Sequence, residues 1–323
     1  MLVLAFVAAL GVGTLDVGAQ GPSTQAASYP VRPIRMLIGF SPGSSLEVVA
    51  RIVGDKLAAK WGQPVVVESR PGAAGNIAAE AVGRAEPDGY TLLLTPPTFV
   101  INAGLYPKLG FDAGAFVPVS LVTSSPNVLV VHPRMAASSV QELVGLAKAN
   151  PGKLNYASMG NGGTPHLTAE LFKSTAVQLE IVHVPYKWTP ALTAVLAGEV
   201  DLMFFNLAGC LPQIRDGRLK ALAVLSERRV AALPDVPAMA EIFPGFVSVT
   251  WFGIVAPPKT PAAIAEKLSA AVAEAVRSPE VTKRLADLSA EPIGSTPAEM
   301  AAFMRQEADR WGAVIRLAKV KVD

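Results

Sequence analysis

The chain has 323 residues, of which 51% are hydrophobic and 17% charged, so it is long enough for two compact lobes with hydrophobic cores and is neither disordered nor fibrous. Its 28 Lys and Arg residues and 26 Asp and Glu residues give a formal charge of +2 without a long basic run, which argues against a nucleic-acid partner. After residue 30 no apolar run reaches the roughly 18 residues needed to span a bilayer, and we expect a soluble mature protein.

The N-terminus has the character of a secretory signal peptide. Residues 2–12 form a continuous apolar block, and the small residues that follow provide a Val-x-Ala cleavage site after Ala19. No Lys or Arg precedes the block, and we expect the true signal peptide to begin upstream of the first residue. A later cut near Ala26 or Ala27 is the alternative. We therefore assign residues 1–28 to a signal peptide and a flexible N-terminus.

The chain contains one cysteine and three histidines. Cys210 stands alone, which excludes an internal disulfide and a cysteine-based metal cluster, and its apolar neighbours predict a small buried side chain rather than a nucleophile. The spacing of His132, His166 and His183 matches no metal-ligand pattern. We therefore expect neither a metal nor a cofactor.

A strand, a loop of small residues and a helix open the predicted fold. Residues 35–40 are expected to form the strand and residues 46–61 the helix, whose apolar side chains recur every four residues. The loop lacks bulk, and the first amides of the helix point toward the same space with the positive end of the helix dipole behind them. This pattern predicts an anion-binding loop, although any βα turn of an open α/β sheet shares it. Its candidate ligand-binding residues are Ser41, Gly43, Ser44 and Ser45.

Ser44 and Glu47 have the spacing of a capping box. Ser44 can accept hydrogen bonds from the early amides of the helix while Glu47 reaches back to the N–H of Ser44. Glu47 also stands four residues before Arg51, the spacing of a helical ion pair. We therefore expect Glu47 to have a structural role through these local contacts. The alternative is that Glu47 contacts a ligand directly.

The next segments continue the alternation of strands and helices. Strands are expected at residues 64–68 and 90–95 with a helix at residues 77–85 between them, which indicates a parallel sheet with right-handed crossovers. Loops at the C-terminal ends of such strands gather ligands, so Thr95 is a further candidate. The section 98–127 is predicted to consist mainly of loops.

A second α/β lobe begins with a strand at residues 128–132 and repeats the opening motif. A strand at residues 154–158 leads into a glycine-rich loop and a helix at residues 164–172, with Thr164 as the predicted N-cap and Pro165 as the first helical residue. The candidate ligand-binding residues of this loop are Ser158, Gly160, Asn161, Gly162, Gly163, Thr164 and His166. The other elements expected here are helices at 139–149, 189–197 and 208–215 and strands at 180–184, 200–204 and 219–225.

The last part of the chain is predicted to return to the first lobe. Its elements are a strand at 251–257 and three helices, each opened by a proline, at 261–277, 279–288 and 297–318. Three helices do not easily close a third domain, so we expect them to pack back on the first lobe. Residues 29–127 and 251–323 would then form lobe 1 and residues 128–250 lobe 2, with two chain crossings and a cleft between the lobes.

Known catalytic templates are absent, which disfavours an enzyme. The chain has no Gly-x-Ser-x-Gly elbow, no P-loop and no His-Glu-x-x-His pair, and residues 160–165 lack the last glycine of the dinucleotide fingerprint. We interpret Ser158 as polar loop lining rather than a nucleophile paired with His166, and His166, beside a helix N-terminus, as neutral. Two small-residue loops, one in each lobe, instead predict opposed clamps closing on an anionic group.

Several ordered motifs extend over residues 29–323. They are Tyr29-Pro30-Val31-Arg32-Pro33-Ile34, the segment 62–76 around Arg70-Pro71-Gly72, Pro87-Asp88-Gly89-Tyr90-Thr91-Leu92, Val184-Pro185-Tyr186-Lys187, Leu233-Pro234-Asp235-Val236-Pro237 and Trp251-Phe252-Gly253. Together they resemble the Bug-type substrate-binding proteins of tripartite tricarboxylate transporters. The resemblance implies an α/β, two-lobed fold of the periplasmic-binding-protein type (type II), with two doubly wound sheets and a hinged ligand cleft.

The resemblance also implies a function. It describes a periplasmic receptor without catalytic activity that captures a small organic carboxylate and delivers it to the membrane permease subunits of the transporter. The family's two pincer loops correspond to Ser41–Glu47 and Ser158–His166, and Tyr186, Phe205 and Asn206 complete the expected site. We expect a monomer. The alternatives are a binding protein that reports its ligand to a signalling pathway and an enzyme on the same fold.

The chain departs from the family pattern at positions that concern the ligand. Glu47 replaces the usual aspartate and Ser44 a usual glycine of the first loop, Trp188 replaces a glycine, and Phe205 stands where many members carry aspartate. An aromatic side chain in place of a polar one predicts a less polar or aromatic carboxylate. The alternative is that Phe205 and Trp188 are packing residues.

Overall fold

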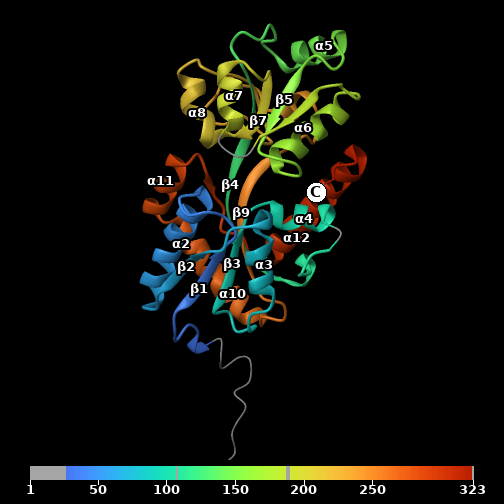
Figure 1. Cartoon of the computed structure of the whole chain (residues 1–323). Coiled ribbons are helices and arrows are strands. Elements are labelled where there is room, and N and C mark those ends of the chain that lie inside the picture. Colours follow the sequence, from blue (N-terminus) through green and yellow to red (C-terminus); the bar gives the residue numbers. More distant parts are fainter. Residues whose placement is uncertain (1–26, 107, 187–189, 322–323) are drawn as a thin grey trace, which may run out of the picture.

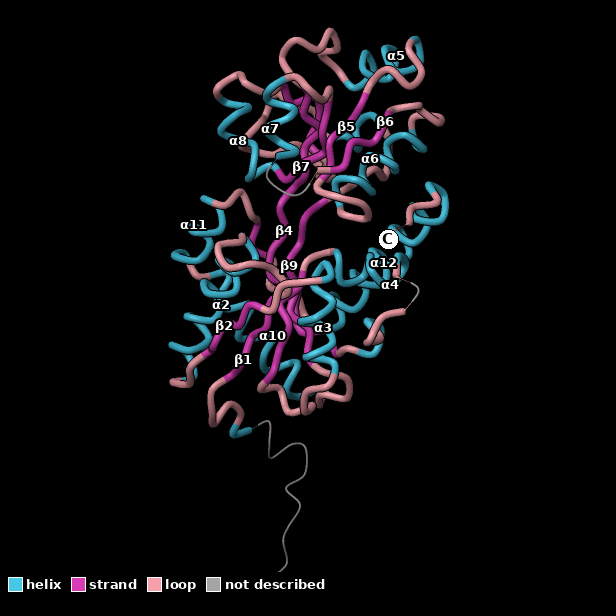
Figure 2. Tube along the Cα trace, viewed as in Figure 1, coloured by secondary structure: helices cyan, strands magenta, loops and turns pink. Residues whose placement is uncertain are grey.

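The computed structural model describes residues 27–106, 108–186 and 190–321. These residues form two lobes, one above the other, and two long strands run between them (Figure 1). In each lobe helices flank a central layer of strands on both sides (Figure 2). Trp188 lies outside the described residues, as do residues 1–26 of the predicted signal segment.

Lobe 1 contains a mixed sheet. Strands β2 (Val65–Ser69), β1 (Ile34–Ile38) and β3 (Thr91–Thr95) pair in parallel, as the strand–helix alternation predicts. Strands β9 (Val249–Ala256), β4 (Val117–Val131) and β10 (Glu291–Pro292) extend this sheet by antiparallel pairing. Its helices are α2 (Ser45–Trp61), α3 (Asn76–Gly83), α4 (Thr98–Leu105), α10 (Ala262–Arg277), α11 (Pro279–Asp287) and α12 (Pro297–Ala318), with 3₁₀ turns at Ala73–Gly75 and Ala113–Ala115.

Lobe 2 is built around the C-terminal half of β4. Strands β7 (Leu202–Asn206) and β8 (Lys220–Val224) pair with β4 in the antiparallel sense, and β5 (Asn155–Ser158) pairs in parallel with β7 and β6 (Val182–Pro185). The helices of this lobe are α5 (Val140–Ala149), α6 (Thr164–Thr175), α7 (Pro190–Ala197), α8 (Leu207–Arg215) and α9 (Met239–Ile242). The predicted strand starting at residue 180 begins two residues later, and the one at 200–204 is shifted by two residues.

Strand β4 joins the two sheets. It pairs with β9 up to Pro126 and with β7 from Asn127 onward, so the sheets of the two lobes share this strand (Figure 2). The change of partner lies close to the predicted boundary between residues 127 and 128, and the division of the chain at that point remains our proposal. Because β9 returns beside β4, two adjacent extended segments connect the lobes.

The prediction that section 98–127 consists mainly of loops is wrong. It contains α4 and the first part of β4, a strand whose prolines and hydroxyl residues hide its extended character in the sequence. The structure satisfies those hydroxyls by tertiary contacts: Ser120 Oγ, Thr123 Oγ1 and Ser125 Oγ donate to carbonyl oxygens of residues 295, 291 and 289, respectively. Burial of polar strand residues therefore depends on a segment more than 160 residues away in sequence.

Two apolar layers cover the faces of each sheet. In lobe 1 one face packs against α2, α10 and α11, and the other against α3, α4 and α12. In lobe 2 one face packs against α5 and α6, and the other against α7 and α8. A further cluster crosses between lobes, where Ile101 and Leu105 of α4 and Trp311 of α12 meet Leu167 of α6. The C-terminal helices thus pack on lobe 1, and α12 also contacts lobe 2.

Candidate ligand-binding cleft

A cavity of about 650 Å³ lies between the lobes, within the size range of small-molecule sites. Both loops predicted to bind the ligand contribute to it, together with α4, β4, β7 and β9. The lining residues are Phe40, Ser44, Ser45, Leu46, Val49, Ala74, Pro96, Pro97, Thr98, Asn102, Leu105, Tyr106, Thr123, Ser125, Asn127, Met159, Asn161, Gly162, Gly163, Thr164, Pro165, Phe205, Asn206, Ala208, Gly209, Thr250, Phe252, Leu288 and Ala290.

The first clamp loop, residues 41–47, is held by the capping residues of α2. Ser44 Oγ accepts the N–H of Glu47 at 3.3 Å, as predicted, but the carboxylate of Glu47 accepts the N–H of Gly43 at 2.7 Å and not that of Ser44. The N–H of Ser44 is already donated to the Ser41 carbonyl at 3.2 Å, which leaves Gly43 as the donor within reach. The Gly43 amide, followed by Arg51, holds the pKa of Glu47 below its usual range. Glu47 therefore shapes the loop and does not line the cavity.

The amides at the start of α2 are available to a ligand. Within the described residues, no acceptor is found for the N–H groups of Ser45 and Leu46, and both residues line the cavity. The N–H groups of the first helical turn point out along the axis, and the helix dipole adds partial positive charge there. This end of the cavity thus offers donors to an anion.

The second clamp loop, residues 158–166, turns with glycines in left-handed conformations. Gly160 has φ of +116° and Gly162 φ of +76°, values that side chains disfavour. The N–H of Gly160 is donated to Ser158 Oγ at 3.2 Å, and that of Gly162 to Nδ1 of His166 at 3.0 Å. Ser158 and His166 thus hold the loop through its backbone, and neither lines the cavity.

Helix α6 begins at Thr164, whereas the predicted N-cap places the first helical residue at Pro165. Gly163 is the N-cap, with φ of −70° and ψ of 160° and no side-chain cap, and Thr164 is already helical. The prediction of Thr164 as the N-cap and of Pro165 as the first helical residue is therefore wrong. Within the described residues no acceptor is found for the N–H groups of Gly163 and Thr164, which line the cavity. Two helix N-termini, one from each lobe, thus present amides to the same cavity.

A stack of rings, in which Tyr156 and His166 are buried and His183 is half-buried, supports the second clamp loop. Residues Tyr156 and Ser158 point to one face of β5, and His183 lies opposite Tyr156 on the adjacent strand β6, so that Oγ of Ser158 is 2.6 Å from Nε2 of His183. The ring of His166 stacks on that of His183 with centroids 4.0 Å apart. Burial first, and the neighbouring His166 second, lowers the pKa of His183 to about 4; burial is also the main reason that the pKa of His166 is lowered.

The partner of Ser158 is therefore His183, a residue that sequence reasoning did not place at the site. The two residues stand 25 positions apart in sequence and meet because β5 and β6 are neighbours in the sheet. Ser158 is fully buried, which suits a structural hydroxyl better than a nucleophile. His166 was predicted to be neutral because of the helix terminus; its pKa is lowered mainly by burial instead.

Half of the predicted ligand-binding residues line the cavity. These are Ser44, Ser45, Asn161, Gly162, Gly163, Thr164, Phe205 and Asn206. The other predicted residues do not line it: Ser41, Gly43, Glu47, Thr95, Ser158, Gly160, His166 and Tyr186. Cys210 is buried and its pKa is raised by burial to about 12, which confirms the interpretation of a small buried side chain.

Sequence reasoning missed the lining contributed by the crossing strands and by α4. Thr123, Ser125 and Asn127 belong to β4, Phe252 belongs to β9, and Asn102 belongs to α4. The motif Trp251-Phe252-Gly253 was recognised as the exit from lobe 2, but nothing in its local pattern indicates that Phe252 faces a cavity. The misassignment of residues 98–127 as loops concealed the others.

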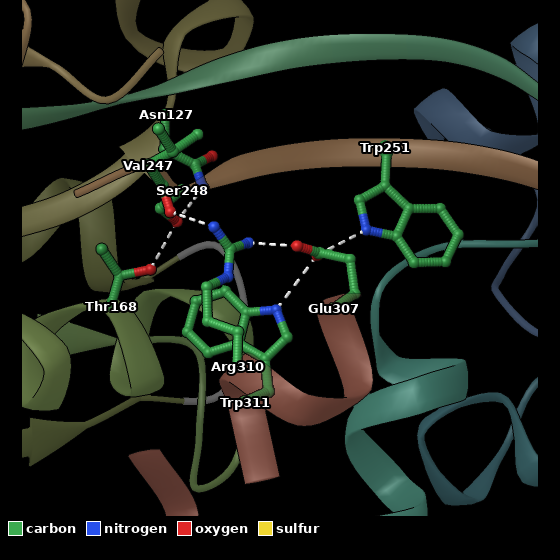
Figure 3. Close-up of polar contacts among 8 residues, drawn as sticks. All are labelled: Asn127, Thr168, Val247, Ser248, Trp251, Glu307, Arg310 and Trp311. Atoms are coloured by element: carbon green, nitrogen blue, oxygen red, sulfur yellow. Dashed lines mark hydrogen bonds and ion pairs between the residues drawn. The ribbon is translucent and has the colours of Figure 1, made fainter. Parts of the chain in front are cut away.

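The connection between the lobes is reinforced by a polar network around Glu307 (Figure 3). Glu307, which is 3% exposed, accepts the indole N–H of Trp251 at 2.8 Å and that of Trp311 at 3.1 Å, and it is paired with Arg310. Arg310 also donates to the carbonyl of Val247 at 2.5 Å, just before β9 begins. Helix α12 is thus fixed to the segment where the chain crosses between lobes.

The same crossing is bound to lobe 2 by hydroxyl groups (Figure 3). Ser248 Oγ accepts from the side-chain amide of Asn127 at 3.0 Å and lies 2.7 Å from Oγ1 of Thr168 on α6. The segment 247–251 therefore contacts α12 of lobe 1 through Val247 and Trp251, and α6 of lobe 2 through Ser248.

Two strands connect the lobes, and a cavity lies between them. The fold and this cleft together define a two-lobed solute-binding protein. Solved structures of this class are similar over almost the entire described chain. R. palustris Rpa4515 with adipate is 33% identical with a TM-score of 0.79, over 91% of this chain and 99% of that chain. MatC (Rpa3494) from Rhodopseudomonas palustris with bound malate is 32% identical with a TM-score of 0.75, over 89% and 100%.

The chain belongs to the tripartite tricarboxylate transporter family receptors, whose model matches residues 49–320. It is also 36% identical to Protein BugT of Bordetella pertussis over 322 residues, which are 98% of each chain. The resemblance to Bug-type substrate-binding proteins drawn from the motifs is thereby confirmed. The family is one of receptors and not of enzymes.

Proposed function

We propose that this protein is a receptor that holds a small organic carboxylate between its two lobes and delivers it to the membrane subunits of a tripartite transporter. The observation that carries the proposal is the pair of helix N-termini that offer amides to one cavity from opposite lobes. Membership in the receptor family and the adipate and malate of the related structures support it.

We assign two roles to the predicted site residues. The lining residues of the clamp loops, together with Phe205 and Asn206, are proposed to contact the ligand. Glu47, Ser158 and His166 are proposed to fix the loop backbones so that the amides converge, because their side chains accept loop N–H groups. Neither role involves a reaction, and we propose no catalytic activity.

The same family supports a proposal for the site of action. We propose that the protein works as a monomer in the periplasm, exported by the apolar N-terminal segment. In the part of the chain that the structure describes, none of the helices has the length and apolar character that crossing a membrane requires. Lobe 1 would comprise residues 29–127 and 251–323 and lobe 2 residues 128–250, with closure about the two crossing segments.

Thermal unfolding with a panel of mono-, di- and tricarboxylates tests the proposal. A ligand present at about 100 times its dissociation constant stabilises a protein by about 2.7 kcal/mol, which is easily measured as a rise in Tm. A flat response over the entire panel would contradict carboxylate capture. Turnover of a bound ligand by the purified protein would favour the enzyme alternative, and unimpaired uptake after gene deletion would favour the signalling alternative.

A further inference from the structure

The described lining of the cleft carries no formal charge. None of its 29 residues is Asp, Glu, Lys, Arg or His. The ionised pair next to the first clamp loop is engaged elsewhere, because Arg51 donates to Glu47 and Glu47 accepts the N–H of Gly43. A ligand in this cavity therefore meets backbone amides, neutral polar groups and apolar side chains in the described part of the chain.

The hydroxyl groups of the crossing strands do not offer donors to a second anionic group. Each hydroxyl has one proton, and three lining residues donate theirs within the protein. These hydrogen bonds are Thr123 Oγ1 to the Glu291 carbonyl at 2.7 Å, Ser125 Oγ to the Ser289 carbonyl at 2.8 Å and Thr250 Oγ1 to Asn127 Oδ1 at 3.0 Å. This part of the lining can accept hydrogen bonds but is a poor partner for a carboxylate.

Aromatic and aliphatic side chains complete the lining. Phe205 of β7 and Phe252 of β9 both face the cavity, with Leu105 and Leu288 among the aliphatic residues. The ring of Phe205 lies against Gly209 of α8, where any Cβ would approach its Cε1 to 2.5 Å. Gly209 thus makes room for the ring, and the ring keeps one side on the cavity.

We infer, on the basis of the proposed function, that the ligand is a monocarboxylate with an apolar body, and that Phe205 determines this specificity. The single carboxylate is held by the amides at the N-termini of α2 and α6, and the body packs on Phe205 and the aliphatic lining. A second carboxylate has no counter-charge in the described lining, and a buried unpaired charge is strongly disfavoured. Each buried methylene, in contrast, raises affinity about fourfold.

Hexanoate and adipate form a matched pair for the test, because they have the same six carbons and differ only at the far end. Isothermal titration calorimetry with the purified protein should give at least tenfold tighter binding of hexanoate. Affinity should also rise from butanoate to hexanoate by about fourfold per methylene. Adipate binding as tightly as hexanoate, or more tightly, would overturn the inference and leave the carboxylate receptor intact.

Phe205→Ala tests the residue, with Phe243→Ala as the control. Phe243 is also a partly buried phenylalanine of lobe 2, but it packs on the core beside α9 and does not line the cavity. Phe205→Ala should weaken hexanoate about tenfold or more without weakening adipate, and Phe243→Ala should change neither. Unchanged hexanoate binding in Phe205→Ala, or an equal loss in both variants, would overturn the role of Phe205.

Two further results separate this inference from the proposed function. If hexanamide, which lacks the negative charge, binds as tightly as hexanoate, anion capture by the helix N-termini is wrong. If neither hexanoate, adipate nor any other carboxylate of the panel binds, the proposed function fails together with the inference.

Discussion

The carboxylate of Glu47 accepts the N–H of Gly43 at 2.7 Å, across the turn that precedes α2. This contact closes the first clamp loop from within, so the side chain of Glu47 is engaged by the loop and does not line the cavity. A closely similar arrangement caps α5, where Ser139 Oγ accepts the N–H of Glu142 at 3.1 Å and Glu142 accepts the N–H of Ser138 at 2.6 Å. The two caps differ in position: only the first lies at the cavity.

Replacing these two glutamates separates loop shape from helix capping. Glu47→Ala and Glu142→Ala should both lower Tm, since each loses one capping contact. Glu47→Ala should also weaken carboxylate binding by about tenfold, because the free loop must be ordered when the ligand binds. Calorimetric titration of both variants checks this, and Glu47→Gln, whose amide oxygen can still accept the Gly43 N–H, should retain most of the affinity. Equal affinities for Glu47→Ala and Glu142→Ala would contradict the role of Glu47.

Gly160→Val tests the second clamp loop. No atom lies within 4 Å of a Cβ added at Gly160, so the substitution acts through its φ of +116°, at about 1–3 kcal/mol. This is less than the usual stability of a folded domain, and the variant should fold while its loop changes shape and loses the ligand-induced rise in Tm. Gly217→Val is the control, since Gly217 also has positive φ and open space but lies away from the cavity. Undiminished binding in Gly160→Val would remove this loop from the site.

The half-buried His183 predicts a loss of stability in weak acid. Its pKa of about 4 in the folded protein lies below the ordinary 6.5, so the unfolded chain takes up the proton first as pH falls. The stabilisation is therefore complete above about pH 6.5 and is lost progressively as the pH drops toward 4. Tm measured between pH 7 and 4 should fall less steeply in His183→Gln than in the wild type.

The groups facing His183 shape this response. His166 stacks on it and has a lowered pKa of its own. Glu170 raises the pKa of both imidazoles, and Lys173 lowers it. His166 should therefore leave part of the slope in place in the His183 variant. His132→Gln is the control, because it replaces the one histidine of the chain that is outside this stack. A pH profile as steep in His183→Gln as in the wild type would contradict a neutral imidazole at position 183.

The Glu307–Arg310 pair predicts strong coupling at the crossing between the lobes. Arg310→Leu removes the hydrogen bond to the Val247 carbonyl and leaves the buried carboxylate of Glu307 without its cation, a loss of about 3 kcal/mol. Glu307→Gln should also be destabilising, because it leaves the guanidinium of Arg310 without its anion. Denaturant unfolding of both single variants and the double variant should give a coupling energy above about 1 kcal/mol. Arg305→Leu, an exposed arginine of the same helix, should have little effect. Additive effects would show that the pair does not act as a unit.

Much of the architecture could be predicted from local patterns. The alternation of strands and helices, the small-residue loops before α2 and α6 and the proline-opened C-terminal helices all follow from periodicity and capping, which depend on neighbours in sequence. The same reasoning was wrong for β4, whose hydroxyl residues and prolines resemble a loop. Its hydroxyl partners lie in the segment 289–295, which no local rule connects to it.

Local sequence is sufficient to predict the two clamp loops, because small residues followed by a helix create unpaired amides at a helix N-terminus. The folded chain is needed to show that these amides face one cavity and that Ser158 pairs with His183. It is also needed to place Thr123, Ser125 and Phe252 in the lining of that cavity. These contacts arise from strand register and from the two crossings between the lobes. They join residues far apart in the chain, whose side chains carry no local signal of their partners.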